Sequence, residues 1–109
     1  MTTDAEYLSQ YDASRFPSPL VTVDSVLFTL HEGALCVLLV ERAHPPQQGA
    51  WGLPGGFIDL AHDDSTRATA LRKLTEKTGI SPSWLEQLDT FSGPDRDPRG
   101  WSLTIAWFA

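Results

Sequence analysis

The sequence predicts a single small α/β domain, because strand patterns and one helix pattern alternate along a chain of 109 residues. Two runs rich in valine and leucine, residues 19–30 and 35–40, surround a short turn and predict a hairpin of two central strands. Residues 65–78 repeat apolar side chains at helical spacing and are followed by a glycine. Residues 101–109 alternate between two sets of side chains, as a strand does.

The N-terminal part comprises an arm, the predicted hairpin and a loop. Residues 1–17 are polar and acidic with scattered aromatic side chains, and we expect an arm that packs on the domain or on a partner subunit. The sequence His31-Glu32-Gly33 supplies the turn of the hairpin. Residues 41–50 contain two adjacent prolines and a glycine and should form a loop.

The helix at 65–78 dominates the second half and would turn Ala68, Leu71 and Leu74 toward the sheet. No turn signal follows the terminal strand, so we expect residues 18–109 to form an incomplete domain. The other expected elements are a segment leading into a glycine-rich loop, a short turn or helix, and a strand, at residues 53–59, 81–84 and 85–91.

Composition and charge exclude several kinds of protein. A net charge of −6 argues against a broad basic face for nucleic acid. The single cysteine, Cys36, lies in an apolar run and is expected to be a buried thiol without a disulfide. No apolar stretch approaches the roughly 20 residues of a membrane span, and the first residues lack the apolar core of a secretion signal. We therefore expect a cytoplasmic protein without a membrane span.

Residues 51–57, WGLPGGF, form the most informative loop. Gly55 and Gly56 would let the backbone approach a phosphate closely, and the N-terminus of the following helix favours anions. Together with Arg72 and Gly79 on that helix, this ordered set resembles the signature of the Nudix hydrolases. The resemblance implies the Nudix fold, a mixed sheet sandwiched by helices, here truncated at its C-terminus.

Two positions of the signature are altered. The family pattern is Gly, five residues, Glu, seven residues, then Arg-Glu-apolar-any-Glu-Glu-any-Gly-apolar, and its glutamates hold Mg²⁺ or Mn²⁺. Lys73 and Lys77 stand where the pattern has glutamates, on one helix face with Glu76. An ammonium group has only hydrogen-bond donors and cannot ligate a metal. Because the metal activates the attacking water, we expect hydrolysis to be weak or absent.

The remaining acids leave two interpretations open. Counting along the pattern puts Asp64 at the position of the first glutamate, after a loop two residues longer than in the family. Asp59, Asp64 and Glu76 would then hold one Mg²⁺ or Mn²⁺ loosely, with Asp64 and Glu76 as the candidate catalytic residues. Alternatively, Asp63 and Asp64 merely favour the start of the helix, where Asp64 or Ser65 would cap it.

A second loop, residues 92–100, contains prolines, glycines and alternating charges. It resembles the segment that follows the signature in ADP-ribose pyrophosphatases and their regulatory relatives. Arginines in a rigid loop suit bidentate recognition of phosphate or of a terminal ribose, and we expect Arg99 to contact a ligand. For Arg96, a ligand contact and a stiffening ion pair with Asp95 or Asp97 both remain open.

Other candidates have structural alternatives. Arg42 would lie at the rim of the pocket in a Nudix fold, or else be a solvated charge at a strand end. Trp51, Phe57 and Trp101 would stack on an adenine or pack in the core. The expected ligand-binding residues are Arg42, Gly55, Gly56, Phe57, Arg72, Lys73, Lys77, Arg96 and Arg99.

The whole chain resembles the Nudix-related transcriptional regulators of NAD metabolism more than the active hydrolases. The resemblance implies a domain that senses ADP-ribose or a related nucleotide, in a homodimer that binds DNA through a winged helix beyond residue 109. On this interpretation Lys73 partly replaces the metal in holding a pyrophosphate. The alternatives are an ADP-ribose pyrophosphatase that releases AMP and ribose 5-phosphate, and a binding module without a nucleotide role. The resemblance rests on AEYLSQYD (5–12), TVDSVLFT (22–29), WGLPGGFID (51–59), LRKLTEKTG (71–79), LEQL (85–88) and RDPRGWSLT (96–104).

Overall fold

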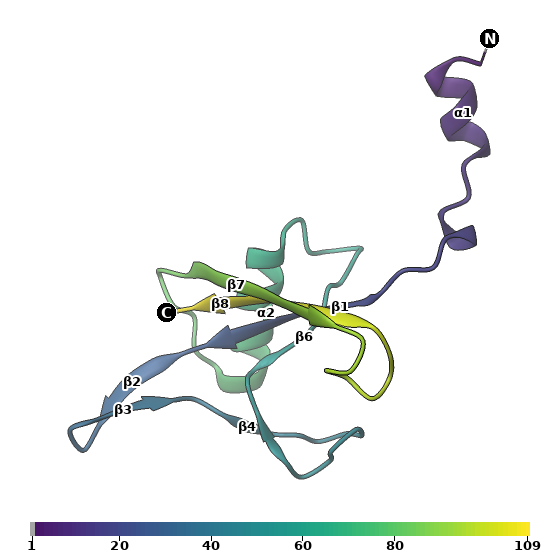
Figure 1. Cartoon of the computed structure of the whole chain (residues 1–109). Helices are drawn as coiled ribbons and strands as arrows, with labels where there is room; N and C mark the ends of the chain where they lie inside the picture. Colours follow the sequence, from purple (N-terminus) through teal and green to yellow (C-terminus); the bar gives the residue numbers. More distant parts are fainter. Residues whose placement is uncertain (1) are drawn as a thin grey trace.

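Four strands form a central mixed sheet in the computed structural model, which describes residues 2–109 (Figure 1). They lie in the order β6-β1-β8-β7. β1 and β8 are parallel, whereas β6 and β7 are antiparallel to their neighbours. This arrangement confirms the mixed α/β fold. The bounds of the strands are Leu20–Val26 for β1, Gly55–Phe57 for β6, Glu86–Gly93 for β7 and Ser102–Phe108 for β8.

Helix α2, Thr66–Thr78, covers one face of this sheet and confirms the predicted helix. The side chain of Ser65 caps its N-terminus by accepting from the backbone N–H of Ala68 at 3.0 Å. Gly79 ends it in the left-handed conformation, with φ 75°. Within residues 2–109, α2 is the helix that packs on the sheet. The core consists of Val23, Ala70, Leu74 and Leu85.

The predicted first strand is divided in two, and its halves belong to different sheets. β1 is central, but β2, Phe28–His31, pairs only with β3, Ala34–Val37, in an exposed two-stranded sheet. The prediction of a hairpin is confirmed, and the prediction that both strands are central is wrong. The chain turns away after Leu27, which packs against the core and accepts the backbone N–H of Leu38.

Positive φ angles at Glu32 and Gly33, 50° and 79°, form the tight turn of this hairpin. Cys36 lies in β3 and is half-buried, not buried as expected, because the hairpin projects from the body (Figure 1). A further two-stranded sheet pairs β4, Val40–Glu41, with β5, Trp51–Gly52. Residues 81–84 form a bend with no helix, and β7 confirms the strand predicted at 85–91.

The N-terminal arm extends away from the sheet (Figure 1). It contains α1, Asp4–Gln10, and the short 3-10 helix η1, Ala13–Arg15, and neither has a buried residue. Tyr11 lies between Tyr7 and Phe16, with ring centroids 5.9 and 5.4 Å apart. The arm therefore does not pack on its own domain, and packing on a partner subunit stays a prediction.

The terminal strand β8 buries its more polar side. Ser102, Thr104 and Ala106 are 0%, 5% and 3% exposed, whereas Trp101 at the strand's start is 50% exposed. Hydropathy alone does not predict this orientation, which places hydroxyl groups inside the molecule. None of the helices in residues 2–109 has the length and apolarity needed to cross a membrane.

Candidate functional site

Twelve residues line a cavity of about 380 Å³ between β1, β6, α2 and the loop that joins β7 to β8. Five of them are basic and two are acidic, so the cavity has a formal excess of positive charge in a protein whose net charge is −6. Such a cavity favours an anionic ligand. All the expected ligand-binding residues except Arg72 lie around it. The lining residues are Thr22, Asp24, Arg42, Leu53, Gly55, Gly56, Phe57, Lys73, Lys77, Arg96, Asp97 and Arg99.

The two lysines of α2 approach the glycine-rich strand β6. Lys77 Nζ donates to the carbonyl oxygen of Gly55. Lys73 lies across Gly56, where a Cβ atom would come within 2.7 Å of Lys73 Cε. A larger residue at Gly56 would therefore displace this lysine, so Gly56 leaves the space in which Lys73 lies.

The lysines are not equally engaged with acids. Lys73 Nζ lies 3.5 Å from Glu76 Oε2. Burial lowers the pKa of Lys77, and the positive charges of Lys73 and Arg42 lower that pKa further. The charges of Asp24 and Glu76 act in the opposite direction and offset part of this repulsion, and an anion in the cavity would relieve the rest.

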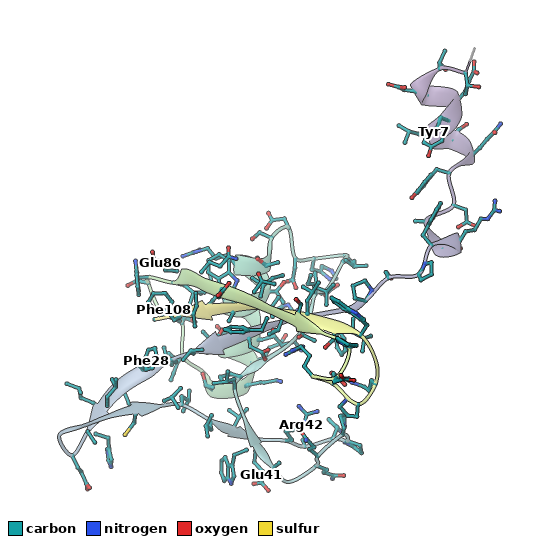
Figure 2. The ribbon with its side chains drawn as sticks, in the orientation of Figure 1. Tyr7, Phe28, Glu41, Arg42, Glu86 and Phe108 are labelled. Carbon is teal, nitrogen blue, oxygen red and sulfur yellow. The ribbon has the colours of Figure 1, made fainter. Side chains whose placement is uncertain are left out.

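Arg42 closes the cavity from the side of the β4–β5 sheet. Its Nε donates to the carbonyl oxygen of Pro46 at 2.7 Å, which fixes the side chain. Figure 2 shows Arg42 facing the loop between β7 and β8, whose residues line the same cavity. Arg42 therefore lies at the cavity, as expected, and its guanidinium is held there by the hydrogen bond to Pro46.

Arg99 is held over Phe57 by Asp97. The guanidinium donates to the carboxylate through Nε at 3.1 Å and Nη2 at 2.8 Å, and the backbone N–H of Arg99 donates at 2.9 Å. These bonds lower the pKa of Asp97 to about 2 and raise the pKa of Arg99. The Arg99 guanidinium carbon lies 5.1 Å from the centre of the Phe57 ring, within cation–π range.

Arg96 is not the arginine that pairs with an acid. Its Nη1 donates to the buried hydroxyl of Ser102 at 2.8 Å, and the ion pair with Asp97 is made by Arg99. The alternative in which Arg96 stiffens the loop through an ion pair is therefore wrong. Arg99 makes the pair with Asp97, because the turn at residues 97–100 brings it back onto that side chain. Of the three aromatic candidates, Trp51, Phe57 and Trp101 are all well exposed, and Phe57 alone lines the cavity.

Arg72 belongs to a clamp behind the cavity. Its Nε and Nη2 donate to the two oxygens of Asp63 at 2.8 and 2.7 Å, and Nη2 also donates to the carbonyl oxygen of Phe57 at 3.3 Å. Asp63 also accepts from Thr69 Oγ1 and from the backbone N–H of Asp59, each at 2.9 Å. The Asp63 side chain is only 4% exposed. The clamp fastens the loop after β6 to the helix.

Sequence reasoning considered Asp63 as a possible oxygen ligand, favoured a role at the start of the helix, and did not foresee its pair with Arg72. The Arg72 guanidinium holds the pKa of Asp63 well below its usual range, and Asp63 raises the pKa of Arg72 in return. Counting along the signature selected Asp64, which is exposed and makes no side-chain hydrogen bond among residues 2–109.

The three acids expected to hold a metal are not brought together. Asp59 accepts from the backbone of Ala61 at 3.0 Å and contacts His62 Nδ1 at 2.9 Å, which lowers the pKa of Asp59. Glu76 pairs with Arg72 at 3.1 Å and with Lys73, and the Arg72 bond is the main reason its pKa is lowered.

Residues 2–109 contain no group of three or more His, Cys, Asp or Glu side chains that could hold a metal ion. Asp64 lies outside the cavity, and Asp59 and Glu76 are engaged by His62 and by cations. The donor set therefore does not fit the divalent cation that the signature implies.

Sequence reasoning also missed Thr22, Asp24 and Thr104. Thr104 Oγ1 donates to Asp24 Oδ2 at 2.5 Å and lies 3.2 Å from the carbonyl oxygen of Thr22. The available signal was an acid in the middle of a valine-rich strand, a place that strands rarely give to aspartate.

Known proteins share both this sequence and this fold. The chain is 47% identical over 108 residues to the ADPR responsive transcriptional repressor NtrR of Acinetobacter baylyi, covering 99% of this chain and 43% of the repressor. It is 34% identical over 89 residues to an ADP-ribose pyrophosphatase of Methanocaldococcus jannaschii, covering 82% of this chain and 49% of that enzyme. The chain thus spans about half the length of these relatives.

A solved structure matches nearly the whole chain. The NUDIX domain of Shewanella oneidensis NrtR, solved in complex with ADP ribose, superposes with a TM-score of 0.96 at 53% identity. The match covers 99% of this chain and 70% of that one. Residues 19–109 also match the family model of the NUDIX domain. The chain therefore belongs to the Nudix family.

Proposed function

We propose that this chain is a nucleotide-sensing Nudix domain that binds ADP-ribose or a related NAD metabolite and hydrolyses it weakly or not at all. The observation that carries the proposal is the position of Lys73 and Lys77. They replace two acids of the Nudix signature and line a cationic cavity beside the glycine-rich strand. The resemblance to a repressor named for its response to ADPR supports the same ligand.

In this proposal the lysines supply charge that a metal would otherwise supply. The Nudix family generally uses divalent metals. An ammonium about 4 Å from a phosphate oxygen contributes roughly 1 kcal/mol in water and about 4 kcal/mol at an effective dielectric constant near 20. Lys73 and Lys77 would hold the pyrophosphate against Gly55 and Gly56, with Arg42 beside them. Mg²⁺ or Mn²⁺ would then add little to binding.

Weak hydrolysis suits a sensor. A ligand shifts a conformational equilibrium only through its different affinity for the two states. Hydrolysis would destroy the ligand and so end the signal that it carries. Arg96, Arg99 and Phe57 would hold the rest of the nucleotide through guanidinium and ring contacts. Arg72 would act indirectly, because it fixes the loop after β6.

We further propose that the domain serves a cytoplasmic, homodimeric transcriptional regulator of NAD metabolism. Residues 1–17 would be an arm that packs on the second subunit, and residues 18–109 the nucleotide-binding domain. DNA would be bound by a separate domain outside these residues. The support is the likeness to the Acinetobacter repressor, of which this chain covers 43%.

An isothermal titration of ADP-ribose into the protein with Mg²⁺ present, followed by chromatography of the same sample, tests the proposal. Saturable binding in the micromolar range with intact ADP-ribose is the expected result. Release of AMP and ribose 5-phosphate at an enzymatic rate would instead support the alternative function, an ADP-ribose pyrophosphatase. Absence of binding would support a module without a nucleotide role.

A further inference from the structure

The central sheet has a polar face opposite helix α2. Side chains alternate along a strand, so Val23, which packs in the core with the helix, and Asp24 point to opposite faces. Thr22 and Asp24 line the cavity, and Thr22 is the register partner of the buried Thr104. A charged side chain within a central strand loses solvation, and this cost is offset only if the charge has a hydrogen-bond or ionic partner.

One oxygen of Asp24 has a partner and the other does not. Thr104 Oγ1 donates to Oδ2 at 2.5 Å, which fixes the orientation of the carboxylate. Within residues 2–109, no donor is hydrogen-bonded to Oδ1. Oδ1 lies against Gly55, where any Cβ atom would collide with it. The same Cβ atom would come equally close to the backbone carbonyl oxygen of Val23, so Gly55 is required both for the close approach of β6 to β1 and for the place of this carboxylate.

The neighbouring cations make their hydrogen bonds and ion pairs with other groups, although the charge of Asp24 acts on Lys77 by raising its pKa. Lys77 donates to the Gly55 carbonyl, Lys73 pairs with Glu76, and Arg99 pairs with Asp97. Among residues 2–109, Asp24 forms no ion pair within 4.0 Å. A carboxylate in a cavity for a phosphorylated ligand repels the phosphate, so Asp24 weakens binding unless another part of the ligand donates a hydrogen bond to it.

We propose that Asp24 determines specificity by accepting a hydrogen bond from a sugar hydroxyl, so that the cavity selects a nucleoside diphosphate that carries a second sugar. This inference rests on the proposed function and adds the group that distinguishes ADP-ribose from ADP. The Thr104 hydroxyl holds the carboxylate in place, and Oδ1 is the acceptor. A site built to bond a hydroxyl rejects the analogue that lacks it, because its own polar group is then left unpaired.

Titrations of ADP-ribose and of ADP into the wild type and Asp24→Ala test the assignment. ADP has the same adenosine and pyrophosphate but lacks the second ribose. Loss of a hydrogen bond to a charged group should weaken ADP-ribose binding by about 10- to 100-fold. The affinity for ADP should stay the same or rise, because a repelling charge is removed. The control is Asp89→Asn, an exposed acid on β7 outside the cavity, which should change neither affinity.

Asp24→Asn keeps the shape of the side chain and an oxygen for Thr104, so it decides the question if Asp24→Ala is shown by circular dichroism to unfold. It should weaken ADP-ribose binding by roughly threefold to tenfold and spare ADP. Equal losses for both ligands would overturn the inference and make Asp24 a residue that only positions the cavity. Failure of the wild type to bind either ligand would overturn the proposed function as well.

Discussion

Helix α2 presents two clusters that differ in how completely their charges are satisfied. In the clamp, Asp63 receives four hydrogen bonds from Arg72, Thr69 and the backbone of Asp59. In the cavity, burial and the charges of Lys73 and Arg42 lower the pKa of Lys77, and among residues 2–109 its hydrogen bond goes to a neutral carbonyl. The charges of the clamp are paired without a ligand, whereas the cavity keeps an excess of positive charge that can bind an anion. In the proposed function, one part of the helix therefore holds the structure together while another part offers charge to a ligand.

The largest effect should follow from restoring the family acids in the cavity. Lys73→Glu with Lys77→Glu changes the charge there by four units, so ADP-ribose affinity measured by titration in EDTA should fall by at least roughly 100-fold. Arg67→Glu is the matched control, because Arg67 is an exposed cation on the same helix outside the cavity. Equal affinities of the double variant and the wild type for ADP-ribose would contradict the claim that the two lysines bind the ligand.

The second prediction concerns the clamp. Asp63→Asn leaves Arg72 without its anionic partner, and breaking a buried ion pair is strongly destabilising. The melting temperature, measured by circular dichroism at pH 7, should fall by roughly 5–15 °C. Asp64→Asn is the control, because Asp64 is exposed, and its melting temperature should match that of the wild type. If the melting temperatures of both variants fell equally, the pair between Asp63 and Arg72 would not be the cause of the stabilisation.

Acid should remove the advantage of the clamp. The pKa of Asp63 is lowered in the folded protein and that of Asp97 is lowered to about 2, so both carboxylates stabilise the fold above their unfolded pKa of about 3.9. This stability is lost progressively as pH falls from about 4 through the lowered pKa values of the folded state, because the carboxylates of the unfolded chain take up protons first.

Melting temperatures from pH 7 to pH 2.5 measure that loss. The gap between the wild type and Asp63→Asn should be widest at pH 7 and should narrow below about pH 4. A gap that stays constant across the range would contradict the assignment of the stabilisation to the ionised carboxylate.

The smallest effect should come from the arginine over Phe57. Asp97→Asn removes the bidentate partner of Arg99, a partly exposed pair, so ADP-ribose affinity should fall by only about threefold. The control is Asp95→Asn. Asp95 lies two residues before Asp97 in the same loop and outside the cavity, so this change should leave the affinity for ADP-ribose unchanged. A loss as large as that of the double lysine variant would show that the two parts of the cavity are coupled.

Local signals in the sequence predicted the parts of the site that neighbouring residues determine. Ser65 was one of two candidate caps, Gly79 was expected to end α2, and the shared face of Lys73 and Lys77 follows from helical spacing. The mixed sheet and the Nudix family were predicted from the order of motifs along the chain, and both are confirmed.

Features that depend on distant pairing were missed. Asp24 faces the cavity because β1 lies beside β8 in a register that no local pattern encodes. The pair between Asp63 and Arg72 joins the loop after β6 to a residue nine positions further along the chain, and the helical pattern did not predict it. The division of residues 19–30 between two sheets likewise depends on Leu27 packing into a core built by the helix.

The most direct test of the exchange of metal for lysine compares the dissociation constants of ADP-ribose measured in EDTA and in Mg²⁺. In the wild type the two constants should agree within about twofold, because Lys73 and Lys77 supply the positive charge themselves. In the variant with both lysines changed to glutamate, Mg²⁺ should strengthen binding by roughly tenfold or more. Wild-type binding that appears only with Mg²⁺ would contradict the account, since the metal would then still hold the pyrophosphate.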